Sequence, residues 1–519
     1  MSFAKVFSAQ TNMLRAHIVS IEVDIVEKGL YTFSIIGLPD KAVEEARDRV
    51  SAAIKNTGFK SPKSQNHKIT ISLAPADIKK EGATFDLGIA LGYLLATDTI
   101  RLNPHKKMFL GELSLDGSVR KINGVLPLVR HALRAGFEEV YVPFENAEEA
   151  ALVHGITVYG VTHLQSVISH LNTKPNEAKQ ERQRTILTAQ ENTLIGSLPE
   201  NSLLDICDVK GQESAKRGLL IAAAGGHNIA MYGPPGTGKT MLAKAFTSIL
   251  PPLSFDEMLE VTSIHSVSNA LDNKLVTHVP FRAPHHTSSY VSIVGGGAIP
   301  KPGEITLAHR GVLFLDEFPE FDRRVIESLR EPLEEGHISI ARAQGTALFP
   351  AQIMLVAAMN PCPCGNYGIV DKQCVCSPLS LDRYRRKISG PIVDRIDLWV
   401  EVSQIDYQAL SNTTRAGKTS SELRKQVTSA HGHQDKRFAN KKANRNSEMS
   451  ARDVNELVPL DRETRELLNM SAKKLDLSAR AYHRIIKLSR TIADLDESRA
   501  VGQKHILEAL QYRLKSGSI

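Results

Sequence analysis

Apolar residues in the segment 1–171 alternate between two spacings. Where every second residue is apolar the pattern predicts a strand, and where apolar residues recur every three or four positions it predicts a helix. The predicted strands lie at 18–25, 31–36, 68–74 and 140–146, and the predicted helices at 41–57 and 87–96. Asp40 is placed to cap the first helix, which ends before Gly58. This order of elements predicts an α/β domain.

A second pattern begins at residue 201, where the predicted strands are almost continuously apolar. Such runs, at 227–232, 311–315 and 352–360, are typical of parallel strands that are buried on both faces. With helices at 213–224 and 241–250, residues 201–402 are predicted to form a second α/β domain with a parallel sheet. A polar segment at 172–200 is predicted to link the two domains.

Residues 403–519 are predicted to form a helical lid, with helices at 423–431, 461–470, 479–494 and 503–514. Between these helices, residues 436–445 are basic and polar. We expect a mobile surface loop there, with nucleic-acid binding as the alternative.

The segment between the run at 227–232 and the next helix carries the strongest chemical signal. It matches the pattern of a phosphate-binding loop, which is a glycine, four residues and then Gly-Lys-Ser/Thr. Glycines let backbone N–H groups surround a phosphate, and the following helix N-terminus favours anions. Lys239 would contact the β- and γ-phosphates of ATP, and the Thr240 hydroxyl would bind Mg²⁺. The predicted ATP-binding residues are Gly233, Pro234, Pro235, Gly236, Thr237, Gly238, Lys239, Thr240 and Met241.

Two adjacent acids, Asp316 and Glu317, end the apolar run at 311–315. Downstream of a phosphate-binding loop, such a pair is typical of ATP hydrolysis. Asp316 is predicted to hold Mg²⁺, directly or through water, and Glu317 to orient and activate the attacking water.

Four of the five cysteines lie within fifteen residues, as two Cys-x-Cys pairs: Cys362, Cys364, Cys374 and Cys376. Thiolate tetrads select Zn²⁺, although the usual ligand spacing is longer than Cys-x-Cys. Two interpretations stay open, a structural Zn²⁺ site and reduced thiols in a loop. The clustering argues against a framework of disulfide bonds.

Charge and hydropathy narrow the cellular setting. The net charge of +7 fits a nucleic-acid partner, but it is small for 519 residues. No apolar run reaches the length of a membrane span, and the N-terminus lacks the apolar core of a signal peptide. We therefore expect a cytoplasmic protein without a membrane partner.

The first domain resembles the proteolytic domain of Lon protease. The resemblance rests on residues 80–84, 111–119 and 142–146. Thr84 stands where Lon carries its nucleophilic serine, and Leu126 stands where it carries its catalytic lysine. Because leucine cannot act as a base, we expect a Lon-like fold without peptidase activity, in a structural or docking role.

The second domain and the lid resemble the AAA+ ATPase superfamily. Asn360 matches sensor 1, whose amide helps to place the attacking water. AAA+ motors usually form hexameric rings, and Arg395 matches the arginine that one subunit presents to its neighbour's nucleotide. The alternative for Arg395 is a structural salt bridge with Asp394 or Asp397. Arg480 matches the sensor-2 arginine.

Segments at 278–286 and 294–304 resemble the magnesium-chelatase-like group of AAA+ proteins, whose second helix carries an inserted hairpin. Residues 337–349 are predicted to form another hairpin. In ring motors of this group such hairpins face the central pore, so Lys301 and Arg342 are candidate DNA-binding residues. Ordinary surface charge is the alternative for both.

Over nearly the full chain, this order of domains resembles the YifB/ComM family. The resemblance implies a homohexameric ATP- and Mg²⁺-dependent helicase that migrates DNA branches during natural transformation, with single-stranded and branched DNA as partners. The alternatives are a magnesium-chelatase motor subunit and a protein-remodelling AAA+ ATPase. A Lon-like protease is opposed by Leu126, and a scaffold that binds nucleotide without hydrolysis is disfavoured by Glu317 and Arg395.

Overall fold

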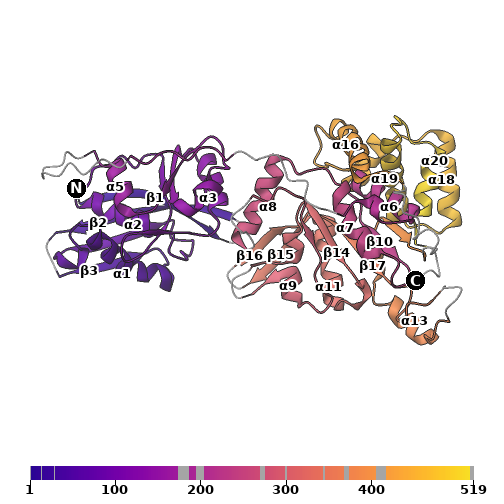
Figure 1. The fold of residues 1–519 in the computed structure, drawn as a ribbon, viewed down its shortest axis with the longest axis horizontal. Coiled ribbons are helices and arrows are strands. Elements are labelled where there is room, and N and C mark those ends of the chain that lie inside the picture. The colour runs from indigo at the N-terminus through magenta and orange to yellow at the C-terminus, as the bar shows by residue number, and fades with distance from the viewer. Residues whose placement is uncertain are drawn as a thin grey trace. The chain divides into compact units, whose positions relative to one another are not determined.

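The computed structural model describes ten stretches of the chain: 2–12, 15–27, 30–173, 186–193, 204–268, 275–297, 301–342, 345–367, 373–404 and 417–514 (Figure 1). They fall into two compact units. The first comprises residues 1–197 together with 258–276, and the second comprises 198–257 together with 277–519. Most of the linker that we predict at 172–200 lies outside the described residues.

The first unit is built on a seven-stranded sheet in the order β3-β4-β2-β1-β5-β8-β9. The pairs β1-β2 and β2-β4 are antiparallel, and the other neighbours are parallel. The strands are β1 (Phe3–Asn12), β2 (Arg15–Val26), β3 (Thr32–Ile36), β4 (Lys68–Ala74), β5 (Lys107–Phe109), β8 (Glu139–Pro143) and β9 (Thr157–Val161), with a separate pair β6 (Glu112–Leu113) and β7 (Val119–Arg120). The helices are α1 (Lys41–Asn56), α2 (Asp86–Ala96), α3 (Val125–Arg134), α4 (Ala147–Ala150) and α5 (Leu164–Leu171).

The four strands and two helices predicted in this unit are confirmed. Their observed ends lie within two residues of the predicted ends, except at the start of β2 and the end of β8. Asp40 caps α1 by accepting a hydrogen bond from Val43 N at 2.8 Å. Strand β1 was not predicted, although it is central to the sheet. Leu126, which we expect to stand in place of Lon's catalytic lysine, is fully buried in α3.

The second unit is organised by a five-stranded sheet in which every neighbouring pair is parallel. All carboxyl ends of the strands therefore lie at one edge of the sheet and all amino ends at the other. The strand order is β11 (Phe281–Arg282), β14 (Gly311–Leu315), β17 (Ile353–Met359), β10 (Ile229–Tyr232) and β18 (Leu398–Glu401). The parallel sheet that the apolar runs predict is confirmed.

Short helices and two hairpins surround this sheet. The helices are α6 (Glu213–Gly225), α7 (Lys239–Ile249), α9 (Tyr290–Val294), α10 (Glu304–Leu307), α11 (Arg323–Ser328), α12 (Arg330–Glu335), α13 (Pro378–Arg385) and α14 (Gly390–Val393). A further helix, α8 (Phe255–Val267), belongs to the first unit from Met258 on. The hairpins pair β12 (Gly295–Gly296) with β13 (Lys301–Pro302), and β15 (His337–Arg342) with β16 (Gly345–Pro350). The second confirms the hairpin predicted at 337–349.

The C-terminal region of the second unit is helical, as predicted. Its helices are α16 (Ser420–Arg437), α17 (Ala451–Leu457), α18 (Arg462–Lys474), α19 (Ala479–Leu495) and α20 (Gln503–Gln511), and α19 packs against α6, α16 and α20. The surface loop predicted at 436–445 is corrected at its start, because α16 extends to Arg437 and the guanidinium of that residue binds Asp494 at 2.6 Å, whereas residues 438–445 form no helix or strand.

Buried polar groups tie α19 to the amino edge of the sheet. Asp494 accepts hydrogen bonds from Arg437 and Arg490 at 2.6 and 2.9 Å, and its side chain is 2% exposed. One turn earlier, Thr491 contacts Nε2 of the fully buried His227 at 2.8 Å. Because buried charges need partners, the Asp494 contacts fix α19 against α16, and the His227 contact fixes it against the sheet.

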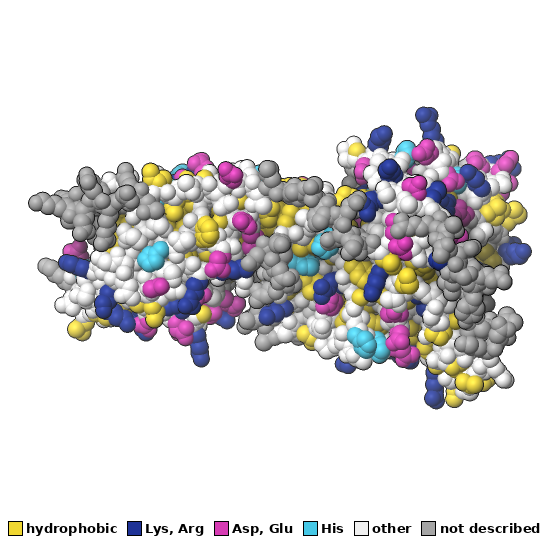
Figure 2. All heavy atoms as spheres, viewed as in Figure 1, with side chains coloured by type: hydrophobic (Ala, Val, Ile, Leu, Met, Phe, Trp, Pro, Cys, Tyr) yellow, Lys and Arg dark blue, Asp and Glu magenta, His cyan; other side chains and the backbone are white. Residues whose placement is uncertain are grey.

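None of the helices in the described part of the chain is long and apolar enough to cross a membrane. On the face drawn in Figure 2, basic and acidic side chains are interspersed over the described residues, without one extended patch of either sign. A nucleic-acid contact on this face would therefore depend on particular residues rather than on a broad basic surface.

Replacing Asp494 with alanine is expected to lower the free energy of unfolding of the second unit by about 3–5 kcal/mol, because Arg437 and Arg490 would stay buried without a counter-ion. Urea unfolding can be followed through Trp399, the single tryptophan, which is 4% exposed in β18.

The matched control for this experiment is Asp435→Ala. Asp435 pairs with Arg445 at 2.7 Å, but its side chain is 64% exposed, so its loss should cost less than about 1 kcal/mol. Equal costs for the two variants would contradict the anchoring role of Asp494.

Candidate nucleotide-binding site

The phosphate-binding loop joins the end of β10 to the start of α7 (Figure 1). Gly236 and Gly238 have φ angles of 77° and 88°, which residues with a Cβ rarely adopt. Gly233 is required for a different reason, since a Cβ there would lie 2.1 Å from the carbonyl oxygen of Val402. The loop is thus fixed by the residue that follows β18 as well as by its own glycines.

Lys239 is folded over the loop that precedes it. Its Nζ donates hydrogen bonds to the carbonyl oxygens of Gly233 and Pro234, both at 2.7 Å, and lies 3.2 Å from Oδ1 of Asn360. Burial lowers the pKa of Lys239 from its ordinary value, and the charge of Asp316 acts in the opposite direction. A buried cation held only by neutral groups is well placed to receive the charge of a phosphate.

Thr240 and Asp316 meet at the carboxyl edge of the sheet, where Oγ1 of Thr240 donates to Oδ2 of Asp316 at 2.7 Å. Both residues were predicted to hold Mg²⁺. A hydroxyl and a carboxylate are the hard oxygen ligands that Mg²⁺ prefers, so this pair fits the ion.

Glu317 extends from the same strand end in an unusual backbone conformation, with φ of 52°. Its carboxylate lies 3.0 Å from Nδ1 of His286 and is 53% exposed. His286 follows β11, the strand next to β14, so the parallel sheet brings the two together. Sequence reasoning missed this histidine, although the His285-His286 pair after a short apolar run was the available signal.

Asn360 directly follows β17 and contacts Lys239, so the predicted sensor-1 residue lies beside the loop. The cysteine-rich segment starts two residues later. A Cβ on Gly365 would lie 2.7 Å from Cδ of Pro235, which places this segment directly against the phosphate-binding loop. Tyr384, in α13, donates a hydrogen bond from its hydroxyl to the carbonyl oxygen of Asn360 at 3.1 Å. This bond links the helix after the cysteine-rich segment to the predicted sensor-1 residue.

The four predicted cysteine ligands converge: Cys362, Cys364, Cys374 and Cys376 are free thiols whose sulfur atoms all lie within 4.8 Å of one another. Three of the Sγ–Sγ distances are 3.4, 3.6 and 3.8 Å. Zinc–sulfur bonds of about 2.3 Å in a tetrahedron require about 3.8 Å between sulfurs, so the cluster fits Zn²⁺. Hydrogen bonds from the backbone of Asn366 and Val375 lower the pKa of Cys364 to about 6, which favours its thiolate, whereas burial raises the pKa of Cys362.

Arg395 and Arg480 lie at the opposite, amino edge of the sheet. The carbonyl oxygen of Arg395 accepts a hydrogen bond from Asn228, which immediately precedes β10, whereas the phosphate-binding loop follows the end of β10. A four-residue strand spans about 13 Å, so these arginines are separated from the loop by the length of a strand. The salt bridges considered for Arg395 are not formed, because Asp394 pairs with Arg484 and Asp397 with His227.

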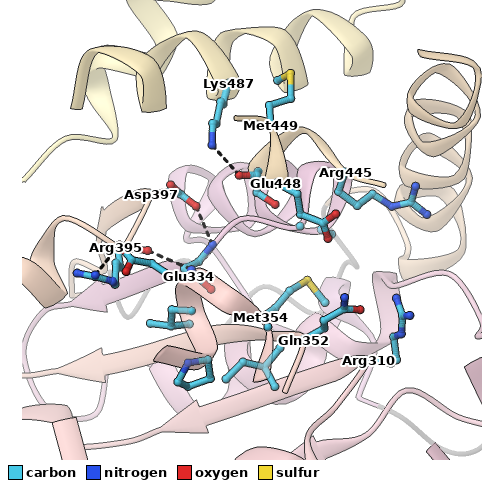
Figure 3. Close-up of a pocket in the computed structure, with 18 of the residues that line it drawn as sticks. Arg310, Glu334, Gln352, Met354, Arg395, Asp397, Arg445, Glu448, Met449 and Lys487 are labelled. Carbon is cyan, nitrogen blue, oxygen red and sulfur yellow. Dashed lines mark hydrogen bonds and ion pairs between the residues drawn. The ribbon is translucent and has the colours of Figure 1, made fainter. Parts of the chain in front are cut away.

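The two arginines line one cavity of about 760 Å³ between the sheet and the C-terminal helices. Figure 3 shows Glu334 and Arg395 pointing toward each other within it. The Glu334 carboxylate binds Nη2 of Arg395 at 2.5 Å and Nη2 of Arg480 at 3.2 Å. Glu334 was not predicted from the sequence, because nothing in its local pattern indicates this pairing.

The two candidate DNA-binding residues lie on separate hairpins. Lys301 is exposed in β13. Arg342 ends β15, but its side chain lies outside the described residues. The structure therefore describes the side chain of Lys301 and only the backbone of Arg342.

Comparisons with known proteins give three family matches along the chain. Residues 205–410 match the family described as magnesium chelatase, subunit ChlI, residues 21–146 match subunit ChlI of Mg-chelatase, and residues 417–513 match the ChlI C-terminal family. The chain is also 43% identical over 515 residues to competence protein ComM of Haemophilus influenzae, covering 99% of this chain and 98% of the relative. The chain belongs to the YifB/ComM family.

Two further relatives of the YifB/ComM family are similar over most of their length. YifB of Salmonella typhimurium is 41% identical over 515 residues, covering 99% of this chain and 97% of the relative. YifB of Escherichia coli is 41% identical over 497 residues, covering 95% and 94%. Both carry the description of an uncharacterized protein, so they support the family and not a specific activity.

His286→Ala is expected to lower kcat for ATP hydrolysis roughly tenfold and leave KM nearly unchanged, because a general base loses orientation when its partner is removed. Steady-state kinetics with ATP would measure both constants. His285→Ala is the neighbouring control and should have a smaller effect. A rise in KM without a fall in kcat would show that His286 supports ATP binding instead.

The purified protein is expected to contain about one Zn²⁺ per chain, since the four thiols match a tetrahedral structural site. Cys374→Ser should lower the bound zinc, measured by elemental analysis, and lower the thermal stability. Cys207→Ser is the control, because Cys207 is buried elsewhere in the unit. Zinc-free protein with full thermal stability would favour reduced thiols.

Proposed function

We propose that the protein is an ATP-driven, hexameric DNA motor that promotes branch migration while incoming DNA is integrated during natural transformation. The ATPase part is carried by one observation: Lys239, Thr240, Asp316, Glu317 and Asn360 converge at one edge of the parallel sheet. Membership of a magnesium-chelatase-like AAA+ family supports the same activity.

Each residue at this edge has a chemical task in the proposal. The loop amides and Lys239 bind the phosphates of ATP, and Thr240 and Asp316 hold Mg²⁺. Bound Mg²⁺ would supply positive charge against the β- and γ-phosphate oxygens. Glu317 orients the attacking water and accepts its proton, with His286 holding the carboxylate.

The placement of the arginines supports a ring of subunits, and the number of six rests on the resemblance to AAA+ motors. Arg395 and Arg480 face away from the loop of their own chain, so they would reach the nucleotide bound by a neighbouring subunit. A guanidinium there would stabilise the charge that develops on the transferred phosphoryl group. Such a contact is head-to-tail, and a head-to-tail contact that closes on itself produces a ring.

The DNA part of the proposal rests on the similarity over the whole chain to competence protein ComM. Lys301 and Arg342 are the candidate contacts, because basic residues on pore hairpins bind the phosphates of a threaded strand. Two other functions are the magnesium-chelatase motor subunit, which the three family matches favour, and a protein-remodelling ATPase.

The proposal predicts that single-stranded DNA and a four-way junction raise the ATPase rate, and that Glu317→Gln abolishes hydrolysis in every condition while nucleotide binding is kept. The expected loss in kcat is at least about 100-fold, because a positioned base contributes that much. The measurement is phosphate release with no DNA, with each DNA and with an unrelated polyanion such as heparin.

The outcomes separate the three functions. Stimulation by the junction but not by heparin, followed by branch migration of a labelled junction, is the expected result. ATP turnover that is indifferent to DNA would contradict the DNA motor and favour the other two classes. A porphyrin-chelation assay with partner subunits would then distinguish the chelatase motor from protein remodelling.

A further inference from the structure

Glu334 is the common partner of Arg395, the candidate trans arginine, and of Arg480, the candidate sensor-2 arginine. One carboxylate oxygen, Oε1, binds Nη2 of Arg395 at 2.5 Å and Nη2 of Arg480 at 3.2 Å. Arg395 comes from the segment before β18, and Arg480 from the start of α19. Without Glu334, two positive charges this close together would repel each other.

This contact occupies Arg395 in the free chain. Its Nη1 donates to the carbonyl oxygen of Pro391 at 2.6 Å and its Nη2 to Glu334, and the side chain is 11% exposed. Its buried Nε has no hydrogen-bond partner among the described atoms. The guanidinium is therefore held but incompletely satisfied, and a triphosphate offers more acceptors and more charge than one carboxylate.

The helix that carries Glu334 also anchors the β15–β16 hairpin. In α12, Glu331 accepts a hydrogen bond from the backbone N–H of Ser339 in β15 at 2.9 Å. On the other strand at this base of the hairpin, Ala351 N, directly after β16, donates to the carbonyl oxygen of Gly336, the C-cap of α12, at 2.7 Å. Because both strands are bonded to α12 and its cap at the base of the hairpin, a displacement of the hairpin would move Glu334.

We propose that Glu334 is a positioning residue, which holds Arg395 and Arg480 in a resting arrangement and releases them to a neighbour's nucleotide when the β15–β16 hairpin moves α12. This inference rests on the proposed function, since it assigns the hairpin to DNA and the arginines to the neighbouring site. Glu334 would thereby link the engagement of DNA to ATP hydrolysis.

Three alanine variants on α12 test this link in the full-length protein. Glu334→Ala should raise the ATPase rate without DNA about fivefold, because the population of free arginines increases, and single-stranded DNA should add little. Glu331→Ala should keep the low basal rate and lose the stimulation by DNA, because the hairpin is uncoupled from α12. Glu335→Ala is the matched control and should behave like the wild type.

The double variant Glu334→Ala/Arg395→Ala tests whether the higher ATPase rate of Glu334→Ala comes from the released Arg395. If it does, the double variant loses this higher rate. A basal rate of Glu334→Ala no higher than that of Glu335→Ala would overturn the inference. If the wild type hydrolyses ATP but Arg395→Ala does so equally well, the proposed function fails instead, so the two failures are distinguishable.

Chemical modification gives a readout that does not depend on ATP hydrolysis. Phenylglyoxal reacts with free guanidinium groups, and peptide mass spectrometry reports the rate at each arginine. Glu334→Ala should speed modification of Arg480 about threefold, because its ion pair is lost. Arg324, which is 79% exposed and pairs with Asp322, is the internal reference. Unchanged modification of both Arg395 and Arg480 would also overturn the inference.

Discussion

The common direction of the five strands in the second unit is the constraint on which the proposed chemistry depends. Because all neighbours are parallel, the segments that follow the strands gather at one edge, and those that precede them gather at the other. The phosphate-binding loop, Asp316 and Asn360 belong to the first group, and Arg395 to the second. Under the proposed function, one chain would carry two complementary halves of a hydrolysis site on opposite edges of its sheet.

The residues at each edge of the sheet are held in place by contacts with neighbouring segments of the chain. The cysteine-rich segment packs on Pro235, so a bound Zn²⁺ would stiffen the phosphate-binding loop from outside. On the opposite edge, Asp494 and the His227–Thr491 contact fix α19, and Arg480 lies in the first turn of this helix. Rigid support of this kind is what a site shared between subunits requires, because small displacements of a charged group are costly to catalysis.

The sequence predicts the candidate site at the carboxyl edge of the sheet well. The residues of this site lie in or directly after continuous apolar runs, and some of them match a phosphate-binding pattern. The prediction fails where a contact joins segments far apart in the chain. His286 reaches Glu317 through the pairing of β11 with β14, and Glu334 reaches Arg480 across 146 positions. Strand β1 was missed because its apolar residues are interrupted by polar ones such as Ser8 and Gln10, which are buried by the fold. Such burial depends on tertiary packing and has no local signal.

The most direct test of a site completed between subunits is to mix two inactive variants. Lys239→Ala removes the phosphate contact and Arg395→Ala removes the trans arginine, so each alone should be inactive. If the site is shared, random mixed rings made from equal amounts should recover about one quarter of the wild-type ATPase rate, since that fraction of interfaces has both residues intact. A mixture no more active than its components would show that each chain completes its own site, which would contradict the account.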